Sequence, residues 1–389
     1  MAVQVHSDEG RIARLVEGIL LRAVQQRASD IHFESLASGF RVRFRIDGIL
    51  HDQNPISEAF RLHVINRLKI LASIDIAEKR VPQDGAFTDL VGTERMSFRV
   101  STFPAEHGEK VVVRLLSNQA ARPLRELGMP DAMARALERV VSQPHGMVLV
   151  TGPTGSGKTS TLYALLRYLE QPERNIVTLE DPIEYRFERI TQGQTNTRSG
   201  FTFARGLRAI LRQDPDIIMV GEMRDQETAD TAFKAALTGH LVLSSLHTNS
   251  AVETVIRLFD MGLERYVIAS SLRVLVGQRL ARLLCEHCRE PAPLDDAQRA
   301  LLGAPPEAQH IFREVGCPRC NRTGFVGRTG LFEVIELDDA FAGLIRKDTT
   351  TRSTLAQEMA RRGLRSIRRA GFDLVLTGRT SLDEVYRVT

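Results

Sequence analysis

The sequence predicts an α/β protein in which a small α+β N-terminal domain precedes a larger domain built around a parallel sheet. Over about the first 115 residues, amphipathic helices are mixed with alternating strands and a hairpin turn, an order typical of an α+β domain. Beyond them, continuous apolar strands are separated by helices, which is the pattern of a parallel sheet with both faces covered.

Length and composition narrow the class of protein. The chain has 389 residues, of which 43% are hydrophobic and 26% charged, and its formal net charge is +4. This length predicts two or three domains, and the composition is that of an ordinary globular protein. The mild, interspersed positive charge permits an anionic partner without arguing for nucleic acid or a membrane surface. Because the N-terminus lacks the apolar core of a signal peptide and no long apolar run occurs, we expect a cytoplasmic protein.

Residues 1–117 are expected to form the N-terminal domain. Apolar residues recur at helical spacing over 11–26 and 60–72, and Asp47-Gly48 is a hairpin turn signal. The expected strands are 30–34, 40–48, 85–90, 94–102 and 110–115. A polar stretch over 118–123, ending in proline, predicts the linker to the next domain.

Arginines stand on several of these strands. Arg41, Arg43 and Arg45 share one face of one expected strand, and Arg99 and Arg114 lie on two later strands. They form either a solvated basic face or, for some of them, a set of cations that reaches a triphosphate bound on the neighbouring domain.

Residues 124–280 are expected to form the core of the second domain. The predicted helices are 129–141, 160–169 and 203–213, and the predicted strands are 147–150, 175–182, 216–222 and 241–246. In parallel sheets, ligands bind beyond the carboxyl ends of the strands. The side chains expected to converge there are Lys158, Glu180, Glu222 and His247.

The segment from Gly152 to Thr159 has the pattern G-x-x-x-x-G-K-T between a buried strand and a helix. Its glycines let backbone N–H groups approach phosphate oxygens, and the helix N-terminus adds its dipole. Lys158 would reach the β and γ phosphates, and the Thr159 hydroxyl would hold Mg²⁺. We therefore expect a nucleoside triphosphate bound by Gly152, Pro153, Thr154, Gly155, Ser156, Gly157, Lys158, Thr159 and Ser160.

Acidic residues and histidines at the strand ends are candidates for the hydrolytic step. Glu222 is the candidate that polarises the attacking water, and Glu180 can help to hold the metal or the water. His240 and His247 can sense the γ phosphate. The alternatives are a helix cap or surface ion pair for each acid, and a structural role for each histidine.

The four cysteines form two C-x₂-C pairs, Cys285 with Cys288 and Cys317 with Cys320. Two such pairs fit a closed, tetrahedral and therefore structural Zn²⁺ site, expected within a module over 281–330. Free thiols or a redox pair are the alternatives, and His287 could compete as a ligand. The Ala/Pro-rich stretch 291–309 is expected to be an exposed loop. A helical C-terminal subdomain is expected over 331–389, with helices at 355–362 and 363–378.

Four segments resemble the boxes of one protein family, in the family's order. They are a Walker A motif over Gly152–Thr159, an Asp box over Glu180–Glu184, a Walker B motif from Leu211 to Glu222, and a His box from Thr238 to Asn249. Segments 28–34, 80–85 and 99–111 are similar to the family's N-terminal domain. The family is the secretion ATPase superfamily, which powers type II secretion and type IV pilus assembly, and the cysteine module resembles its secretion and pilus-extension branch.

The resemblance implies a RecA-like P-loop ATPase domain, with Arg99 and Arg114 contacting ATP when the two domains close. It also implies a homo-hexameric ring that hydrolyses ATP with Mg²⁺ and drives pilin or pseudopilin assembly. The motion would pass to a platform protein of the cytoplasmic membrane, with which the chain associates peripherally through its partners.

Three other functions remain open. They are a related motor for conjugation or DNA uptake, a pilus retraction motor, and an ATP-gated scaffold with little turnover. The chain has no tryptophan and only 6% aromatic residues, which leaves little for a base-stacking platform, so nucleic acid is not the expected partner. The intact Lys158 and Glu222 argue against a scaffold.

Overall fold

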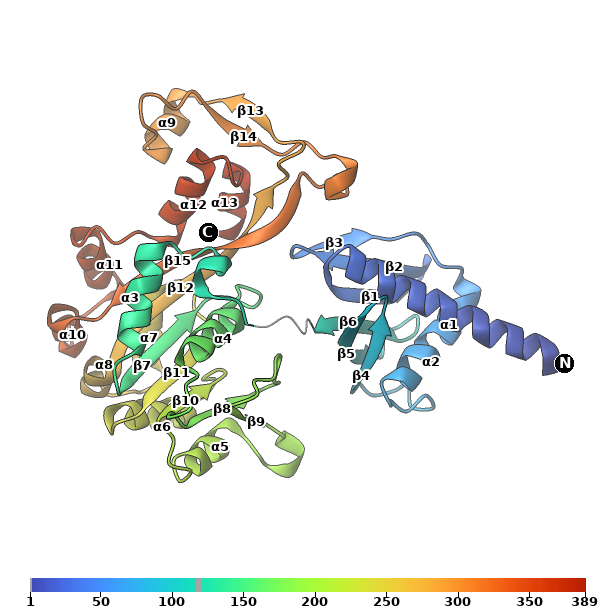
Figure 1. Cartoon of the computed structure of the whole chain (residues 1–389), viewed down its shortest axis with the longest axis horizontal. Helices are drawn as coiled ribbons and strands as arrows, with labels where there is room; N and C mark the ends of the chain where they lie inside the picture. Colours follow the sequence, from blue (N-terminus) through green and yellow to red (C-terminus); the bar gives the residue numbers. More distant parts are fainter. Residues whose placement is uncertain (1, 117–120) are drawn as a thin grey trace. The chain divides into compact units, whose positions relative to one another are not determined.

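The computed structural model describes residues 2–116 and 121–389. The chain divides into two compact units, residues 1–120 and 121–389 (Figure 1). The linker expected over 118–123 lies partly outside the described residues, because 118–120 are not among them.

The N-terminal unit is a six-stranded antiparallel sheet with two helices on one face. The helices are α1 (Ala2–Gln25) and α2 (Arg61–Leu71), and a short 3₁₀ helix, η1, spans Glu58–Phe60. The strands are β1 (Ala28–Leu36), β2 (Gly39–Ile46), β3 (Ile49–Asp52), β4 (Gln83–Val91), β5 (Glu94–Phe103) and β6 (Lys110–Leu116), in the order β3-β2-β1-β6-β5-β4. The hairpin predicted at Asp47-Gly48 is confirmed, since both residues have positive φ and join the pair Ile46 and Ile49.

Alternation along the strands gives this sheet one apolar face and one polar face. Ile31 and Phe33 of β1 are fully buried in the core formed with α1 and α2. Asp30 and Glu34 alternate with these two residues along β1, so their side chains point to the opposite face of the sheet. The acidic side chains of β1 therefore lie on the face that the helices leave uncovered.

The C-terminal unit is built on a seven-stranded sheet in the order β15-β12-β7-β11-β10-β8-β9. Neighbouring strands are parallel, except that β15 runs antiparallel to β12. Their bounds are β7 (Gly146–Thr151), β8 (Ile176–Glu180), β9 (Thr191–Gln194), β10 (Ile217–Val220), β11 (Leu241–Leu246), β12 (Leu272–Leu284) and β15 (Phe325–Glu336). The predicted parallel sheet is confirmed.

Helices cover both faces of this sheet, as the continuous apolar strands predict. Val148 and Val150 of β7 pack with α3 (Asp131–Val141) and α4 (Lys158–Leu169). Met147 and Leu149, which alternate with them, pack on the opposite side. The helices of that side are α5 (Phe203–Ile210), α6 (Gln226–Leu237), α7 (Ala251–Asp260), α8 (Arg265–Ser271), α10 (Asp339–Arg346) and α11 (Arg352–Arg361).

The sequence prediction missed β12 and β15. These long strands pair along most of their length, and both belong to the main sheet. The boundaries expected at 280/281 and 330/331 therefore fall inside continuous strands, and the cysteine module is the tip of a ribbon that leaves the sheet (Figure 1). Arginines interrupt the apolar residues of β12, so the sequence pattern does not indicate a strand, although the strand is buried for most of its length.

The expectation of an exposed loop over 291–309 is wrong. The segment contains the end of β13 (Glu290–Pro293), which pairs with β14 (His310–Arg313), and the helix α9 (Asp296–Leu302). Asp295 and Gln298 form a capping box at the start of α9. Leu302 is fully buried in a small core with α12 (Ile367–Leu376) and α13 (Leu382–Val388), so this segment is packed.

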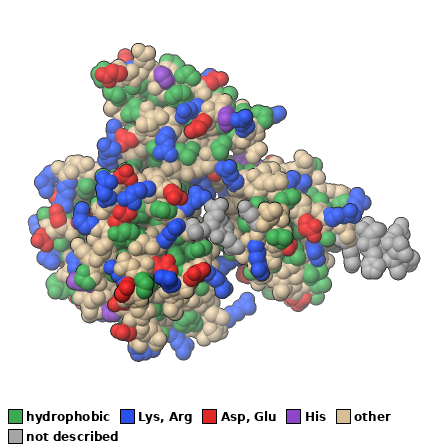
Figure 2. All heavy atoms as spheres, viewed as in Figure 1, with side chains coloured by type: hydrophobic (Ala, Val, Ile, Leu, Met, Phe, Trp, Pro, Cys, Tyr) green, Lys and Arg blue, Asp and Glu red, His purple; other side chains and the backbone are tan. Residues whose placement is uncertain are grey.

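The surface mixes charges of both signs. On the face drawn in Figure 2, Lys and Arg side chains are interspersed with Asp and Glu side chains. Within the described ranges, none of the helices is both long enough and apolar enough to span a bilayer.

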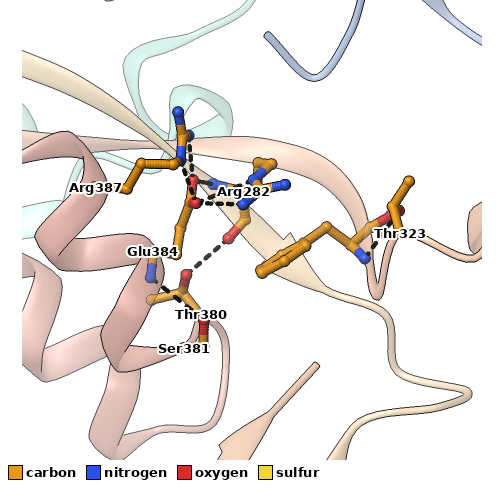
Figure 3. Close-up of polar contacts among 7 residues, drawn as sticks. Arg282, Thr323, Thr380, Ser381, Glu384 and Arg387 are labelled. Carbon is orange, nitrogen blue, oxygen red and sulfur yellow. Dashed lines mark hydrogen bonds and ion pairs between the residues drawn. The ribbon is translucent and has the colours of Figure 1, made fainter. Parts of the chain in front are cut away.

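The C-terminal helix α13 holds the ribbon just before Cys285 (Figure 3). The Glu384 side chain is fully buried and accepts hydrogen bonds from the Arg282 backbone N–H at 2.8 Å and from its Nη2 at 2.7 Å. Arg387 Nη2 donates to the same carboxylate at 2.6 Å, and Thr380 Oγ1 donates to the Arg282 carbonyl at 2.8 Å. Burial opposes ionisation, but the two arginines prevail and lower the pKa of Glu384.

We expect Glu384→Ala to lower the free energy of unfolding of the C-terminal unit by about 3 kcal/mol, because it leaves Arg282 without its buried partner. Urea unfolding followed by circular dichroism measures the change. The matched control is Glu290→Ala, which removes an exposed ion pair with Arg313 and should cost less than about 1 kcal/mol. Equal effects of the two substitutions would contradict this role of Glu384.

Candidate functional site

The phosphate loop joins β7 to α4 and has the backbone that the sequence predicts. Gly152, Gly155 and Gly157 have φ of +156°, +79° and +89°. A Cβ on Gly152 would lie 2.4 Å from Ser156 Oγ and 2.5 Å from the Gln278 carbonyl oxygen, so only glycine fits there. Gly157 caps α4 without any side-chain hydrogen bond, which leaves the first N–H groups of the helix for a ligand. This cradle fits a phosphate group.

Lys158 folds back over the loop. Its Nζ donates to the carbonyl oxygens of Gly152 at 2.9 Å and Pro153 at 3.2 Å. Burial lowers the pKa of Lys158; the charge of Glu222 opposes this shift and that of Arg279 adds to it. The ammonium group therefore already lies in the loop where phosphate oxygens would replace the carbonyl partners.

The other predicted loop residues divide into buried and exposed positions. Ser156 is buried. Neither its Oγ nor the Oγ1 of Thr151, at the end of β7, has a hydrogen-bond partner among the described residues. Thr159 is half-buried in the first turn of α4. Pro153, Thr154, Gly155 and Ser160 are exposed.

Glu222 and His247 meet at the carboxyl edge of the sheet. Glu222 follows β10, His247 follows β11, and His247 Nε2 lies 3.1 Å from Glu222 Oε2. Arg224 forms an ion pair with the other oxygen of Glu222 and lies 3.9 Å from Asp181. The Glu222 side chain is only 15% exposed, so these two neighbours fix its direction.

Glu180 faces the protein interior. It is 2% exposed, and Thr178 Oγ1 and Gln192 Nε2 donate to its Oε1 at 2.6 and 3.0 Å. The hydroxyl of Tyr163 donates to its Oε2. Burial first, and then the neighbouring carboxylate, raise the pKa of Tyr163. Because protein donors occupy both oxygens, the geometry does not support Glu180 as a ligand of the metal or the water.

His240 lies at the amino ends of the parallel strands, whereas the phosphate loop lies at their carboxyl ends. It precedes β11, where Gly146 N–H donates to its carbonyl oxygen at 3.0 Å, whereas the loop follows the far end of β7. Its Nδ1 lies 3.1 Å from the Ala235 carbonyl oxygen. The structure therefore does not bring His240 to the phosphate loop of its own chain. Both histidines belong to the same sequence motif, but β11 lies between them, so they are at opposite ends of that strand.

Arg99 and Arg114 lie side by side on the uncovered face of the N-terminal sheet. They are direct partners across β5 and β6, and Arg114 Nε donates to Asp30 at 2.9 Å. On the same face, Glu34 accepts from Arg43 at 2.8 Å and pairs with Lys110 at 3.1 Å. Burial opposes the ionisation of Glu34, but these two cations hold its pKa at about 2. Several of the basic residues are thus anchored by buried acids.

The four cysteines form one cluster. The Sγ atoms of Cys285 and Cys317 are 3.9 Å apart, those of Cys288 and Cys320 are 3.8 Å apart, and all four lie within 4.8 Å of one another. Four thiolates around Zn²⁺ at about 2.3 Å would be roughly 3.8 Å apart, so the cluster fits this ion. Against the effect of burial, backbone N–H groups of Cys317 and Gly324 lower the pKa of Cys320 to about 6. His287 is exposed and lies outside the cluster.

Comparison with known proteins places these features in a family. The model of the family described as "Type II/IV secretion system protein" matches residues 5–387. The chain belongs to this family. It is 48% identical over 387 residues to type II secretion system protein E of Pseudomonas aeruginosa, which covers 98% of this chain and 76% of that protein. It is also 48% identical over 384 residues to type II secretion system ATPase E of Vibrio cholerae, with the same shares covered.

Solved structures agree with the fold of this secretion-family chain. The pilus retraction motor PilT, solved with bound ADP, has a TM-score of 0.65 at 26% identity, covering 95% of this chain and 96% of that one. The ATPase DotB of Legionella pneumophila has a TM-score of 0.70 at 22% identity, covering 95% and 93%, which supports the fold alone. The predicted resemblance to secretion ATPases is confirmed.

Sequence reasoning missed several residues of the site in this secretion-family chain. Arg224 contacts Glu222, and Tyr163 and Gln192 contact Glu180. Gln278 of β12 lies against the phosphate loop and accepts a hydrogen bond from Thr161 Oγ1 at 2.7 Å. Arg224 is close enough to Glu222 in sequence to have been considered, but Gln278 is more than a hundred residues from the loop and β12 itself was not predicted.

Proposed function

We propose that this chain is the ATP-hydrolysing motor of a type II secretion or type IV pilus-like assembly machine. The observation that carries the proposal is the meeting of the phosphate loop and the Glu222–His247 pair at one edge of the sheet, in a chain 48% identical to a type II secretion system ATPase. The bound ADP named for PilT supports a nucleotide in the corresponding fold.

The residues of the site would divide the work of hydrolysis. The N–H groups of the loop and Lys158 bind the β and γ phosphates, and the Thr159 hydroxyl holds Mg²⁺, which neutralises charge that develops on the phosphates. Glu222 orients the attacking water, because water is a poor nucleophile until a base positions it. His247 keeps the carboxylate of Glu222 in place through the contact at 3.1 Å.

The cations of the N-terminal unit would complete the site when the two domains close on ATP. Arg99 and Arg114 add positive charge next to the triphosphate, and their contacts exist only in the closed state. ATP binding thereby favours the closed state. Hydrolysis allows the domains to open again, so that chemical energy is converted into domain rotation.

We further propose that the chain works as a homo-hexamer in the cytoplasm. It would pass the rotations to a platform protein of the inner membrane and associate with that membrane through partners. Filament subunits are then added in steps that follow ATP turnover.

The first test is steady-state ATP hydrolysis by the wild-type chain, with oligomer mass measured on the same samples with and without ATP. The motor predicts turnover that rises with a six-subunit species. Tight nucleotide binding with no turnover in a formed hexamer would favour the scaffold instead. Stimulation of turnover by DNA would favour a nucleic-acid motor.

The cysteine cluster is proposed to hold one structural Zn²⁺ per chain. We expect Cys317→Ser to release the metal and to lower the unfolding midpoint of the C-terminal unit, because structural zinc contributes folding energy. Metal content by mass spectrometry and urea unfolding check both effects. The control is His287→Ser, which changes an exposed side chain in the first cysteine pair and should keep the metal. Zinc retained at wild-type content in Cys317→Ser contradicts the assignment.

A further inference from the structure

The segment that carries His247, residues 247–250, runs between β11 and α7 and is here called the His247 loop. It borders a cavity of about 350 Å³ together with Glu253, Ile256, Arg257, Asp260 and Arg352. Its Asn249 and Ser250 also border a second cavity of about 310 Å³. A segment with space on two sides is not held by close packing, so its position depends on a few directed contacts.

Some of these contacts are internal to the loop and α7. Thr248 Oγ1 lies 2.7 Å from Thr254 Oγ1, and the Asn249 N–H donates to Glu253 at 3.1 Å. Such bonds fix the shape of the loop. At its start His247 continues from β11, where the Gly152 N–H donates to the Leu246 carbonyl oxygen at 3.3 Å, and at its end α7 packs in the core. The residues between these two ends need a contact of their own.

Arg279 of β12 supplies such a contact. Its Nη2 donates to the Asn249 carbonyl oxygen at 2.6 Å, and its Nη1 donates to the Gln278 carbonyl oxygen at 3.0 Å. That same Gln278 oxygen is the atom that a Cβ on Gly152 would approach to 2.5 Å. One guanidinium therefore joins the His247 loop to the backbone that supports the phosphate loop.

Glu333 of β15 supplies a second contact at the other end of the loop. It is 5% exposed, and its Oε1 accepts a hydrogen bond from the Ala251 N–H at 3.1 Å, where α7 begins. Glu333 lies directly across the ribbon from Gly277, two residues before Arg279. The ribbon of β12 and β15 thus contacts both ends of the segment from Asn249 to Ala251.

We propose that Arg279 is a positioning residue for hydrolysis, which holds the His247 loop at a fixed distance from the phosphate loop so that His247 can orient Glu222. This inference rests on the proposed ATPase function. Arginine suits the role because its planar guanidinium donates in two directions at once, to Gln278 and to Asn249, whereas a lysine ammonium is a point charge on a flexible stem. A misplacement of about 1 Å at a catalytic group can cost roughly 100-fold in rate.

The test compares Arg279→Gln with Arg273→Gln, which changes an arginine near the start of the same strand, beside Gly146. We expect Arg279→Gln to lower kcat by roughly 10- to 100-fold while the Kd for ATP stays within about twofold of wild type. Arg273→Gln should keep wild-type kcat. Arg279→Lys, which keeps the charge but not both directed bonds, should fall between wild type and Arg279→Gln.

A double-mutant cycle separates positioning from the alternatives. If Arg279 acts through His247, adding Arg279→Gln to His247→Ala lowers kcat by no more than about twofold further. Additive losses would overturn the proposal, as would a weakened Kd for ATP, which would make Arg279 a phosphate ligand. A lower kcat that is fully explained by a loss of folded protein, measured through a lowered unfolding midpoint, would also overturn it.

Hydrogen exchange of the backbone amides of residues 248–251 provides a readout that does not need turnover. Exchange there should be faster in Arg279→Gln than in wild type and unchanged in Arg273→Gln. If the wild-type chain does not hydrolyse ATP, the proposed function fails, yet this measurement still decides whether Arg279 holds the loop. Unchanged exchange in Arg279→Gln overturns the positioning role.

Discussion

Lys158→Ala is expected to weaken nucleotide binding by roughly 100-fold and to lower ATP hydrolysis with it. The Nζ of Lys158 lies in the mouth of the loop, 2.9 Å and 3.2 Å from the carbonyl oxygens of Gly152 and Pro153. Losing its charge-assisted hydrogen bonds to phosphate should cost about 3 kcal/mol, which is roughly a 100-fold weaker affinity. Titration calorimetry with ATP and Mg²⁺ measures the loss.

A control shows that the loss is local. Because the hydrogen bonds of the ammonium go to loop carbonyls and the group is not part of the apolar core, Lys158→Ala should keep an unfolding midpoint close to that of wild type. ATP affinity within about threefold of wild type, in a folded variant, would remove Lys158 from the phosphate site.

Glu222→Gln is expected to keep nucleotide binding but to lower kcat by roughly 100- to 1,000-fold, the range that loss of a positioned general base produces. Glutamine has nearly the same shape, so it can keep a contact with His247 and Arg224. It cannot accept a proton from water or carry the negative charge that pairs with Arg224.

The measurement is single-turnover hydrolysis in parallel with binding of ATP to the same preparations. Glu290→Gln, which changes an exposed acid of the cysteine module, serves as the matched control and should hydrolyse ATP at the wild-type rate. If Glu222→Gln loses binding as much as Lys158→Ala does, Glu222 supports the site and does not act on the water.

The parts of the site that the sequence predicts are those determined locally or by strand direction. The phosphate loop is recognisable because its glycines, lysine and flanking elements lie within one short segment. Glu222 and His247 were predicted to converge because each follows an apolar strand, and parallel strands end at the same edge. The same reasoning, applied strictly, would have excluded His240, since it precedes its strand.

The parts that could not be predicted depend on contacts between distant segments. The partners of Glu180 come from α4 and β9, and no local signal distinguishes a carboxylate that faces a metal from one that faces a buried tyrosine. Residues 272–284 mix arginines with apolar residues, so their period does not identify a strand that is buried by its neighbours β7 and β15. The packed segment 291–309 was mistaken for a loop because its core partners lie in α12 and α13.

The course of β12 between its two register shifts, from Val274 to Arg282, has a consequence for insertions and deletions. Side chains of a regular strand alternate between its two faces, so one residue added between 274 and 277 would turn Gln278 away from the phosphate loop and Arg279 away from the His247 loop. Residues added at the exposed positions 305–307, between α9 and β14, would not change the alternation along the stem of the ribbon. Natural length variation in chains of this fold should therefore gather at the tip and avoid the stem.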